Sequence, residues 1–462
     1  MTPPPAPALD PTRALAEFAR ADHGAKFPAR AREMARDALI DCVGCMLIGS
    51  REPLAASLLQ VVTPAPPGTP GSLLAGTART APPADAALYN GTVAHAIDYD
   101  DTNHPAYAHP SAVLVPVLLA LGPAAGARGR DLVTAYIVGL EVFGKLGRAL
   151  NFTHYRQGWH ATATFGSLAA AAVAGRLLGL GARELARALG IAASTAGGLR
   201  AHFGTMTKPL HAGCAARNGV LAALLARTGF TAHEQVLTHP EGYAQVLNHG
   251  EGIDVAALAS WGEPLEILTD YGLALKPYPS GGATHPGIEA ALRVREALGG
   301  RTDHLRAVRV GVAERAFDEL AYEVPADPLE AKFSLHYCVA AALVQGQVDL
   351  ATFTPEAVAS PAIAAVLAKV RMEVDPAVRD STEFATIVTA ETEAGETFTH
   401  TVPLAEGKPA RWFTPERLRA KFFDCAGRAA PPGALEPLYD TLRDVERVSA
   451  AELADALRAP FA

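Results

Sequence analysis

The pattern of apolar and polar positions divides the chain into a helical part and a mixed part. Apolar residues recur at the 3.6-residue helical period through most of the first 270 positions. This periodicity predicts helices over about residues 10–20, 29–48, 84–97, 112–121, 131–150, 161–178, 182–193 and 215–226. Several of these segments are apolar on every side and rich in alanine and glycine, which is typical of helices buried inside a bundle.

The pattern changes after about residue 271. Apolar and polar positions alternate, as in a half-buried strand, over residues 305–312, 370–374, 385–390 and 397–402, with a helix expected over 329–344. Helices return over about 415–426, 434–445 and 450–457. The chain is therefore predicted to be mainly α, with a large helical domain (residues 1–270, joined by 405–462) and a smaller α+β domain (271–404).

Composition and charge limit which binding partners and which cellular location can be expected. The 462 residues carry a net charge of −8 and show no basic stripe, which argues against nucleic acid. No uncharged apolar run reaches the roughly 18 residues of a membrane span. The proline-rich first eleven residues lack the apolar core of a secretory signal and are expected to form a loose tail. Five scattered cysteines do not suggest a disulfide framework, so we expect a cytoplasmic protein.

Two stretches gather the side chains that could carry chemistry. The first, NGTVAHAIDYDDTNHPAYAHPSAV over residues 90–113, contains Asp98, Thr102 and His109 between two apolar helices. If the helix continues that far, Asp98 and Thr102 share a face, because they are four residues apart. Its three aspartates repel one another, which can raise the pKa of one carboxyl and make it a usable base. The alternative, at about even odds, is that the aspartates cap helices or face solvent.

The second stretch, residues 193–219, places Lys208 in a loop, indicated by Gly204, Pro209 and Gly213, before an alanine-rich helix. His160 and His285 also stand at predicted helix starts, where the helix dipole favours an anionic ligand. A single histidine or lysine is more often structural or solvated than functional. The informative feature is therefore that several such residues occur at predicted helix starts. The chain has no dinucleotide, P-loop or HExxH motif, and the spacing of His104 and His109 is not typical of a metal site. The pattern therefore predicts acid–base chemistry on an anion, without metal or cofactor.

The chain resembles the MmgE/PrpD family, which includes 2-methylcitrate dehydratase, cis-aconitate decarboxylase and iminodisuccinate epimerase. The matching segments run in family order from about residue 90 to 426: NGTVAHAIDYDDT, HPSAVLVPVLLALG, GWHATATFGSLAAAA, ALGIAAS, FGTMTKPLHAGCAARNG, KPYPSGGATHPGIEAAL, EAKFSLHY and LRAKFFDCA. The resemblance implies a large helical domain with a smaller α+β lid, a homodimer, and no metal or cofactor. Two departures concern the site: Gly281 replaces a cysteine frequent in the family, and the loop between Thr102 and His109 is about one residue longer than in the decarboxylases.

The resemblance also implies site residues, through positions that match the cis-aconitate decarboxylase branch. The implied catalytic residues are Asp98 and His160 for proton transfer, Thr102 for orienting a donor, and Lys208 for stabilising negative charge. The implied substrate-binding residues are His109, His285 and, as a looser match, Tyr322.

The leading hypothesis is a lyase of the 2-methylcitrate dehydratase type acting on a di- or tricarboxylate. Iminodisuccinate epimerase is the close alternative, and cis-aconitate decarboxylase is the third. A binding protein without turnover is disfavoured, because drift would be expected to erode at least one of these residues.

Overall fold

The computed structural model describes residues 10–23, 26–66, 68 and 71–462. The predicted tail at residues 1–9 and positions 67, 69 and 70 of an expected proline/glycine loop lie outside this part. The chain forms two compact units: a helical unit, which extends to Leu275 and resumes over Thr414–Ala462, and an α+β unit, Lys276–Phe413. The sequence pattern places the corresponding boundaries at residues 270 and 404.

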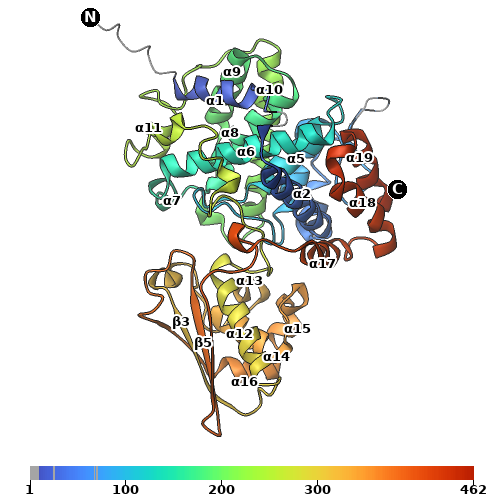
Figure 1. Ribbon diagram of the computed structural model, residues 1–462. Helices are drawn as coiled ribbons and strands as arrows, with labels where there is room; N and C mark the ends of the chain where they lie inside the picture. Colours follow the sequence, from blue (N-terminus) through green and yellow to red (C-terminus); the bar gives the residue numbers. More distant parts are fainter. Residues whose placement is uncertain (1–9, 24–25, 67, 69–70) are drawn as a thin grey trace, which may run out of the picture. The chain divides into compact units, whose positions relative to one another are not determined.

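The helical unit holds the great majority of the helices (Figure 1). Its helices are α1 (Pro11–Arg20), α2 (Ala29–Gly49), α3 (Pro53–Leu58), α4 (Pro83–Ala94), α5 (Ser111–Leu121), α6 (Gly129–Leu150), α7 (Thr153–Arg156), α8 (Ala161–Leu177), α9 (Ala182–Thr195), α10 (Thr207–Arg227), α11 (Tyr243–Leu247), α17 (Pro415–Ala426), α18 (Pro432–Arg443) and α19 (Ala450–Arg458). A two-stranded antiparallel ribbon, β1 (Ser72–Leu73) and β2 (Thr80–Ala81), completes it. The mainly α fold class is confirmed.

Small residues let the central helices of this unit pack closely. α10 packs against α4, α8 and α9. A Cβ atom at Gly213 of α10 would lie 2.2 Å from the carbonyl oxygen of Leu88 in α4, and one at Gly219 would lie 2.3 Å from the Cβ of Ala170 in α8. Because no side chain fits at either point, the glycines bring the helix axes together. This close packing places the first turn of α10 beside the ends of α4 and α8.

The carboxyl-terminal helices return to the helical unit, as the pattern predicts, and α17 packs against α2. Lys421 of α17 is buried, and its Nζ lies 2.6 Å from Oδ1 of Asp41 in α2. The same ammonium donates to the Tyr99 carbonyl at 2.8 Å and lies 4.0 Å from the centroid of the Tyr99 ring. One lysine therefore ties two helices to the loop that follows α4.

The α+β unit contains a four-stranded mixed sheet in the order β4-β3-β5-β6. β3 (Leu305–Val312) pairs parallel with β4 (Val370–Val374) and antiparallel with β5 (Thr386–Thr392), which pairs antiparallel with β6 (Thr397–Val402). The helices of this unit are α12 (His285–Ala297), α13 (Pro328–Ala331), α14 (Leu335–Gln345), α15 (Pro355–Val358) and α16 (Pro361–Leu367). α12 and α14 pack against the sheet, as Figure 1 shows.

The single helix predicted over 329–344 is two helices. α13 ends at Ala331, and Ser334 then caps α14 by accepting a hydrogen bond from the backbone N–H of Tyr337. A serine hydroxyl competes for backbone donors in this way, so it favours a helix start over a helix interior. Among the described residues, no helix is long and apolar enough to span a membrane.

Candidate active site

The loop after α4 carries the first group of candidate residues. α4 ends at Ala94, with His95 as its cap, so the predicted helix to residue 97 is too long. Asp98 then has a φ of 57°, a left-handed conformation that aspartate adopts more readily than most residues. The expectation that Asp98 and Thr102 share a helical face is therefore wrong. Thr102 instead pairs through its backbone with Ala274.

A lysine–aspartate ion pair lies in this loop region. Nζ of Lys208 is 3.1 Å from Oδ1 of Asp98, and Nε2 of His109 is 3.8 Å from the same oxygen. The three side chains are 13–14% exposed, so each is sheltered but accessible to a small molecule. Two groups that can carry positive charge thus meet at one carboxylate oxygen, which is a suitable arrangement for binding a second carboxylate.

Lys208 lies on a helix and not in a loop as the sequence suggested. α10 begins at Thr207, eight residues before the predicted start at 215. Pro209 had indicated a loop, but proline is tolerated in the first turn of a helix, where its missing N–H would have no intrahelical partner. The ammonium of Lys208 therefore projects from the first helical turn of a tightly packed helix.

His160 and His211 form a buried pair beside this lysine. His160 caps α8, and its Nδ1 lies 3.0 Å from Nδ1 of His211, so one ring donates and the other accepts. Burial, together with nearby His95 and Lys208, lowers the pKa of His160 well below its usual value. Burial lowers the pKa of His211 to about 4, with His202 and His95 acting in the same direction. Both rings are therefore neutral near pH 7.

The pKa values of the two neighbouring aspartates Asp100 and Asp101 are shifted in opposite directions. Burial would raise the pKa of Asp100, but His95 and His109 outweigh it and hold that pKa well below its ordinary range. Burial raises the pKa of Asp101 to about 7, against a hydrogen bond from Ser111 and with the help of the charge on Asp100. The sequence argument that crowding raises one carboxyl pKa thus applies to Asp101, which bonds to Ser111 and Tyr136.

The structure brings together Asp98, His109, His160 and Lys208 within the helical unit. Two other predicted residues, His285 and Tyr322, belong to the α+β unit. His285 is the first residue of α12, and its Nε2 donates to the Ser280 carbonyl at 3.1 Å. Tyr322 is 38% exposed in the segment before α13. The roles suggested for these two residues stay predictions.

Sequence reasoning gave no role to His95, Asp100 or Phe203. Nδ1 of His95 lies 2.9 Å from a carboxylate oxygen of Asp100. The centroid of the Phe203 ring lies 5.0 Å from the centroid of the His160 ring and 5.4 Å from Nζ of Lys208. A histidine five residues before an aspartate was visible in the sequence, but only the turn at Asp98 brings the two side chains together. Phe203 begins the FGTMTKPLHAG segment, but neither its residue type nor its spacing in the sequence indicates a place beside His160 and Lys208.

Four of these groups have the composition of a cation site. Ligand atoms of His95, Asp98, Asp100 and His109 all lie within 4.8 Å of one another, so the cluster could hold a metal ion. However, the Lys208 ammonium already lies against Asp98 at 3.1 Å, and a divalent ion there would be repelled by it. The ligand atoms of this cluster therefore fit the Lys208 ammonium better than a metal ion.

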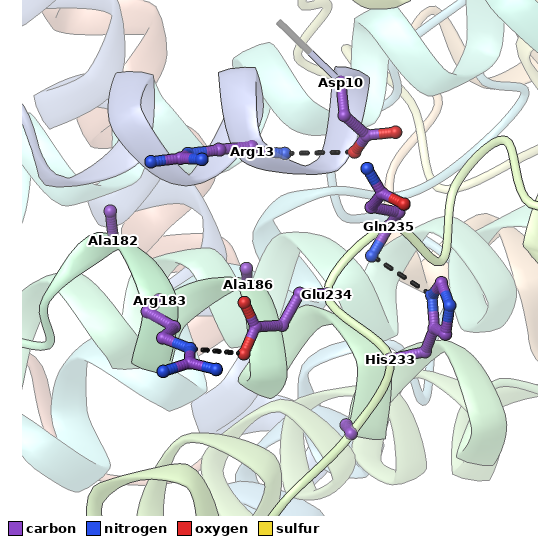
Figure 2. Close-up of a pocket in the computed structure, with 9 residues that line it drawn as sticks. Asp10, Arg13, Ala182, Arg183, Ala186, His233, Glu234 and Gln235 are labelled. Atoms are coloured by element: carbon purple, nitrogen blue, oxygen red, sulfur yellow. Dashed lines mark hydrogen bonds and ion pairs between the residues drawn. The ribbon is translucent and has the colours of Figure 1, made fainter.

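A separate hollow of about 600 Å³ lies elsewhere on the helical unit (Figure 2). It is bordered by the start of α1, the start of α9 and the segment 232–235. Arg183 pairs there with Glu234 at 2.7 Å, and none of the predicted site residues lines it. Figure 2 shows this pair, and it shows Asp10 and His233 accepting hydrogen bonds from the backbone N–H groups of Arg13 and Gln235.

Two family domains match nearly the whole described chain. The MmgE/PrpD N-terminal domain matches residues 13–256, and the MmgE/PrpD C-terminal domain matches residues 278–436. The chain belongs to the MmgE/PrpD family. The chain is 31% identical to cis-aconitate decarboxylase of Mus musculus over 79% of its own length and 76% of the relative's. It is 28% identical to cis-aconitate decarboxylase of Aspergillus terreus, with 71% and 70% covered.

A further member of the family catalyses a different reaction. The 2-methylcitrate dehydratase of Cupriavidus necator is 26% identical, with 75% of this chain and 74% of the relative covered. These MmgE/PrpD relatives are lyases, and none of them is named as an epimerase. The family assignment made from the sequence is confirmed, and membership of a family that contains these lyases supports the prediction that the protein is an enzyme.

Proposed function

We propose that this protein is a lyase that decarboxylates cis-aconitate or a closely similar unsaturated tricarboxylate. The observation that carries the proposal is the accessible Lys208 ammonium, 3.1 Å from Asp98, with His109 against the same oxygen. The identity of 31% to a cis-aconitate decarboxylase supports the same reaction. This order differs from the sequence-based one, which put dehydration first.

The chemistry of decarboxylation suits the groups at this site. The bond between a carboxylate and its carbon breaks and CO₂ leaves, its electron pair forms a new C=C bond, and the former C=C pair takes up a proton at the far carbon. The protein must bind the remaining carboxylates, stabilise negative charge next to them, and donate one proton. An ammonium can do all three, because it is both a cation and a donor.

The proton donor is better assigned to Lys208 than to His160. We expected His160 to transfer protons, but its lowered pKa keeps it neutral at pH 7, so it has no imidazolium proton to give. A lysine ammonium donates and does not accept, and Asp98, 3.1 Å from Nζ of Lys208, offers a carboxylate that can accept and return a proton. We therefore assign proton donation to Lys208 through Asp98, carboxylate binding to His109, and shaping of the site to His160. Thr102 remains a candidate for orienting a donor.

Dehydration of 2-methylcitrate is the second candidate, favoured by the relative that is 26% identical. It breaks a C–H and a C–O bond, so it needs a base and then an acid. Asp98 is the accessible carboxylate that could act as the base. A dehydratase would therefore use the same two residues one after the other, with Asp98 as the base first and Lys208 as the acid afterwards.

The test is proton NMR in D₂O with the EDTA-treated protein and four compounds: cis-aconitate, 2-methylcitrate, citrate and iminodisuccinate. Decarboxylation predicts loss of the cis-aconitate vinyl signal and a new terminal methylene signal, with deuterium at one carbon. A 2-methylcitrate methyl doublet that becomes a singlet on a new C=C bond, or a new vinyl signal, from that compound alone would support dehydration. Exchange at the α-carbon of iminodisuccinate alone would support epimerisation. If the folded protein transforms none of the four, the proposed substrate class is wrong.

A further inference from the structure

Asp100 contacts two histidines of the site and is fully buried. Its carboxylate oxygens lie 2.9 and 3.0 Å from Nδ1 of His95, and one of them lies 3.4 Å from Nδ1 of His109. The side chains of Asp100 and His95 have no solvent exposure, whereas that of His109 is 14% exposed. Asp100 therefore cannot contact a bound substrate directly, but it contacts a residue that can.

The partners of the two rings fix which nitrogen carries a proton. Nδ1 of His109 lies 3.0 Å from the carbonyl oxygen of Asp101, and a carbonyl only accepts, so Nδ1 must be an N–H group. Nδ1 of His95 faces the carboxylate of Asp100 and must donate for the same reason. The Nε2 of His109 is consequently the nitrogen turned to Asp98 and to the accessible side of the site.

His95 lies against His109 with a ring separation of 4.3 Å. Within the described part of the chain, Nε2 of His95 has no hydrogen-bond partner, and the residue is 1% exposed. A buried aspartate and a buried histidine thus support the exposed ring from one side. Such supporting groups commonly set the tautomer and orientation of a functional histidine.

The charges around His109 make this support important for an anionic ligand. Asp98 and Asp100 contribute two negative charges and Lys208 one positive charge, a sum of −1 when the histidines are neutral. The other groups that face the ring are His95 after α4 and His160 at the start of α8, with Asp101 turned towards Ser111. A polycarboxylate would be repelled unless a histidine is protonated, and a buried carboxylate favours the protonated ring.

We propose that Asp100 is a positioning residue, which holds His109 as the Nδ1–H tautomer and supports its protonated form when a polycarboxylate binds. The proposal rests on the proposed function only in taking a polycarboxylate as the ligand. It assigns a task to an aspartate that does not contact substrate. Anion binding should then weaken as pH rises from 6 to 8.

The first test is calorimetric binding of propane-1,2,3-tricarboxylate, which lacks the reactive C=C bond, to wild type and Asp100→Asn between pH 6 and 8. Wild type should bind more weakly at higher pH. Asp100→Asn should lose most of this pH dependence, since removal of an adjacent opposite charge disfavours the protonated ring. Asp37→Asn, at a buried aspartate on α2, is the matched control and should bind as wild type does.

The second test determines the tautomers of the two rings in the wild-type protein. Nitrogen NMR of ¹⁵N-histidine-labelled enzyme, with signals assigned from His95→Gln and His109→Gln, should show both Nδ1 atoms protonated without ligand. A single Nε2–H tautomer for His109, or an unchanged pH dependence of binding in a folded Asp100→Asn, would overturn the proposal. Tautomers and binding as predicted, without turnover of cis-aconitate, would contradict the proposed reaction and leave the role of Asp100 supported.

Discussion

The two units of the chain differ in where pairs of charged side chains lie, with some buried in the helical unit and others exposed on the sheet of the α+β unit. The helical unit buries ionisable side chains, among them Asp41 with Lys421 and Asp100 with His95, at less than about 2% side-chain exposure. The described ion pairs of the α+β sheet lie at its surface, for example Arg309 with Glu373 at 3.0 Å, where both side chains are about half exposed. Surface pairs contribute little to stability, whereas a buried charge costs much if its partner is removed. The helical unit therefore carries the electrostatic constraints that accompany a reactive site.

The largest effect is expected where a buried pair loses one partner. Burial lowers the pKa of Lys421, but Asp41 outweighs this and raises it, so the lysine is charged. Lys421→Met should reduce the free energy of unfolding by about 3–5 kcal/mol, because it leaves the Asp41 carboxylate buried and uncompensated. Urea denaturation measures the change. The double variant Asp41→Asn/Lys421→Met should be milder, and equal losses in the single and double variants would contradict the explanation.

A buried histidine should make the helical unit sensitive to acid. Burial lowers the pKa of His154 to about 4. Between pH 6.5 and 4 the unfolded chain binds a proton that the folded one does not, so stability is present above pH 6.5 and is lost as pH falls. His154 should account for a loss of up to about 2 kcal/mol between pH 7.5 and 5. The loss in His154→Gln, measured by urea denaturation at both pH values, should be smaller by that amount.

The smallest effect is expected in the α+β unit. Arg309 of β3 pairs at 3.0 Å with Glu373, where both side chains are about half exposed, and with Asp375, whose side chain is 12% exposed. Glu373→Gln should change the free energy of unfolding by about 0–1 kcal/mol, because it removes only the exposed pair, and exposed pairs gain little over solvation. A loss as large as that of Lys421→Met in the same denaturation experiment would remove the contrast between the two units.

Much of the fold follows from local sequence pattern. The strands β3, β4 and β6 and the helix α17 begin and end where the periodicity predicts. The errors occur where a local signal was outweighed: proline in the first turn of α10 indicated a loop, and Ser334 interrupts an otherwise helical run. In both cases the position of a helix terminus depends on which backbone N–H and C=O groups find hydrogen-bond partners. The spacing of residues in the sequence does not show these partners.

The candidate site was partly predictable. Asp98, His109, His160 and Lys208 were identified by their motifs and do come together. The tasks of Asp100 and His95 could not be predicted, because they depend on the left-handed turn at Asp98 that brings both carboxylates to the histidines. Spacing in the sequence suggested a helical face there, and a single backbone conformation changes which side chains meet.

The central claim is that the Lys208–Asp98 pair carries out a lyase reaction on an unsaturated tricarboxylate. The most direct measurement is CO₂ release from cis-aconitate by EDTA-treated wild type and by Lys208→Met, each shown to be folded by circular dichroism. Wild type should release CO₂, and Lys208→Met should be slower by about 10²–10³-fold, as expected when a charge-stabilising donor is removed. Equal rates in the two proteins, or no CO₂ from wild type, would contradict the account.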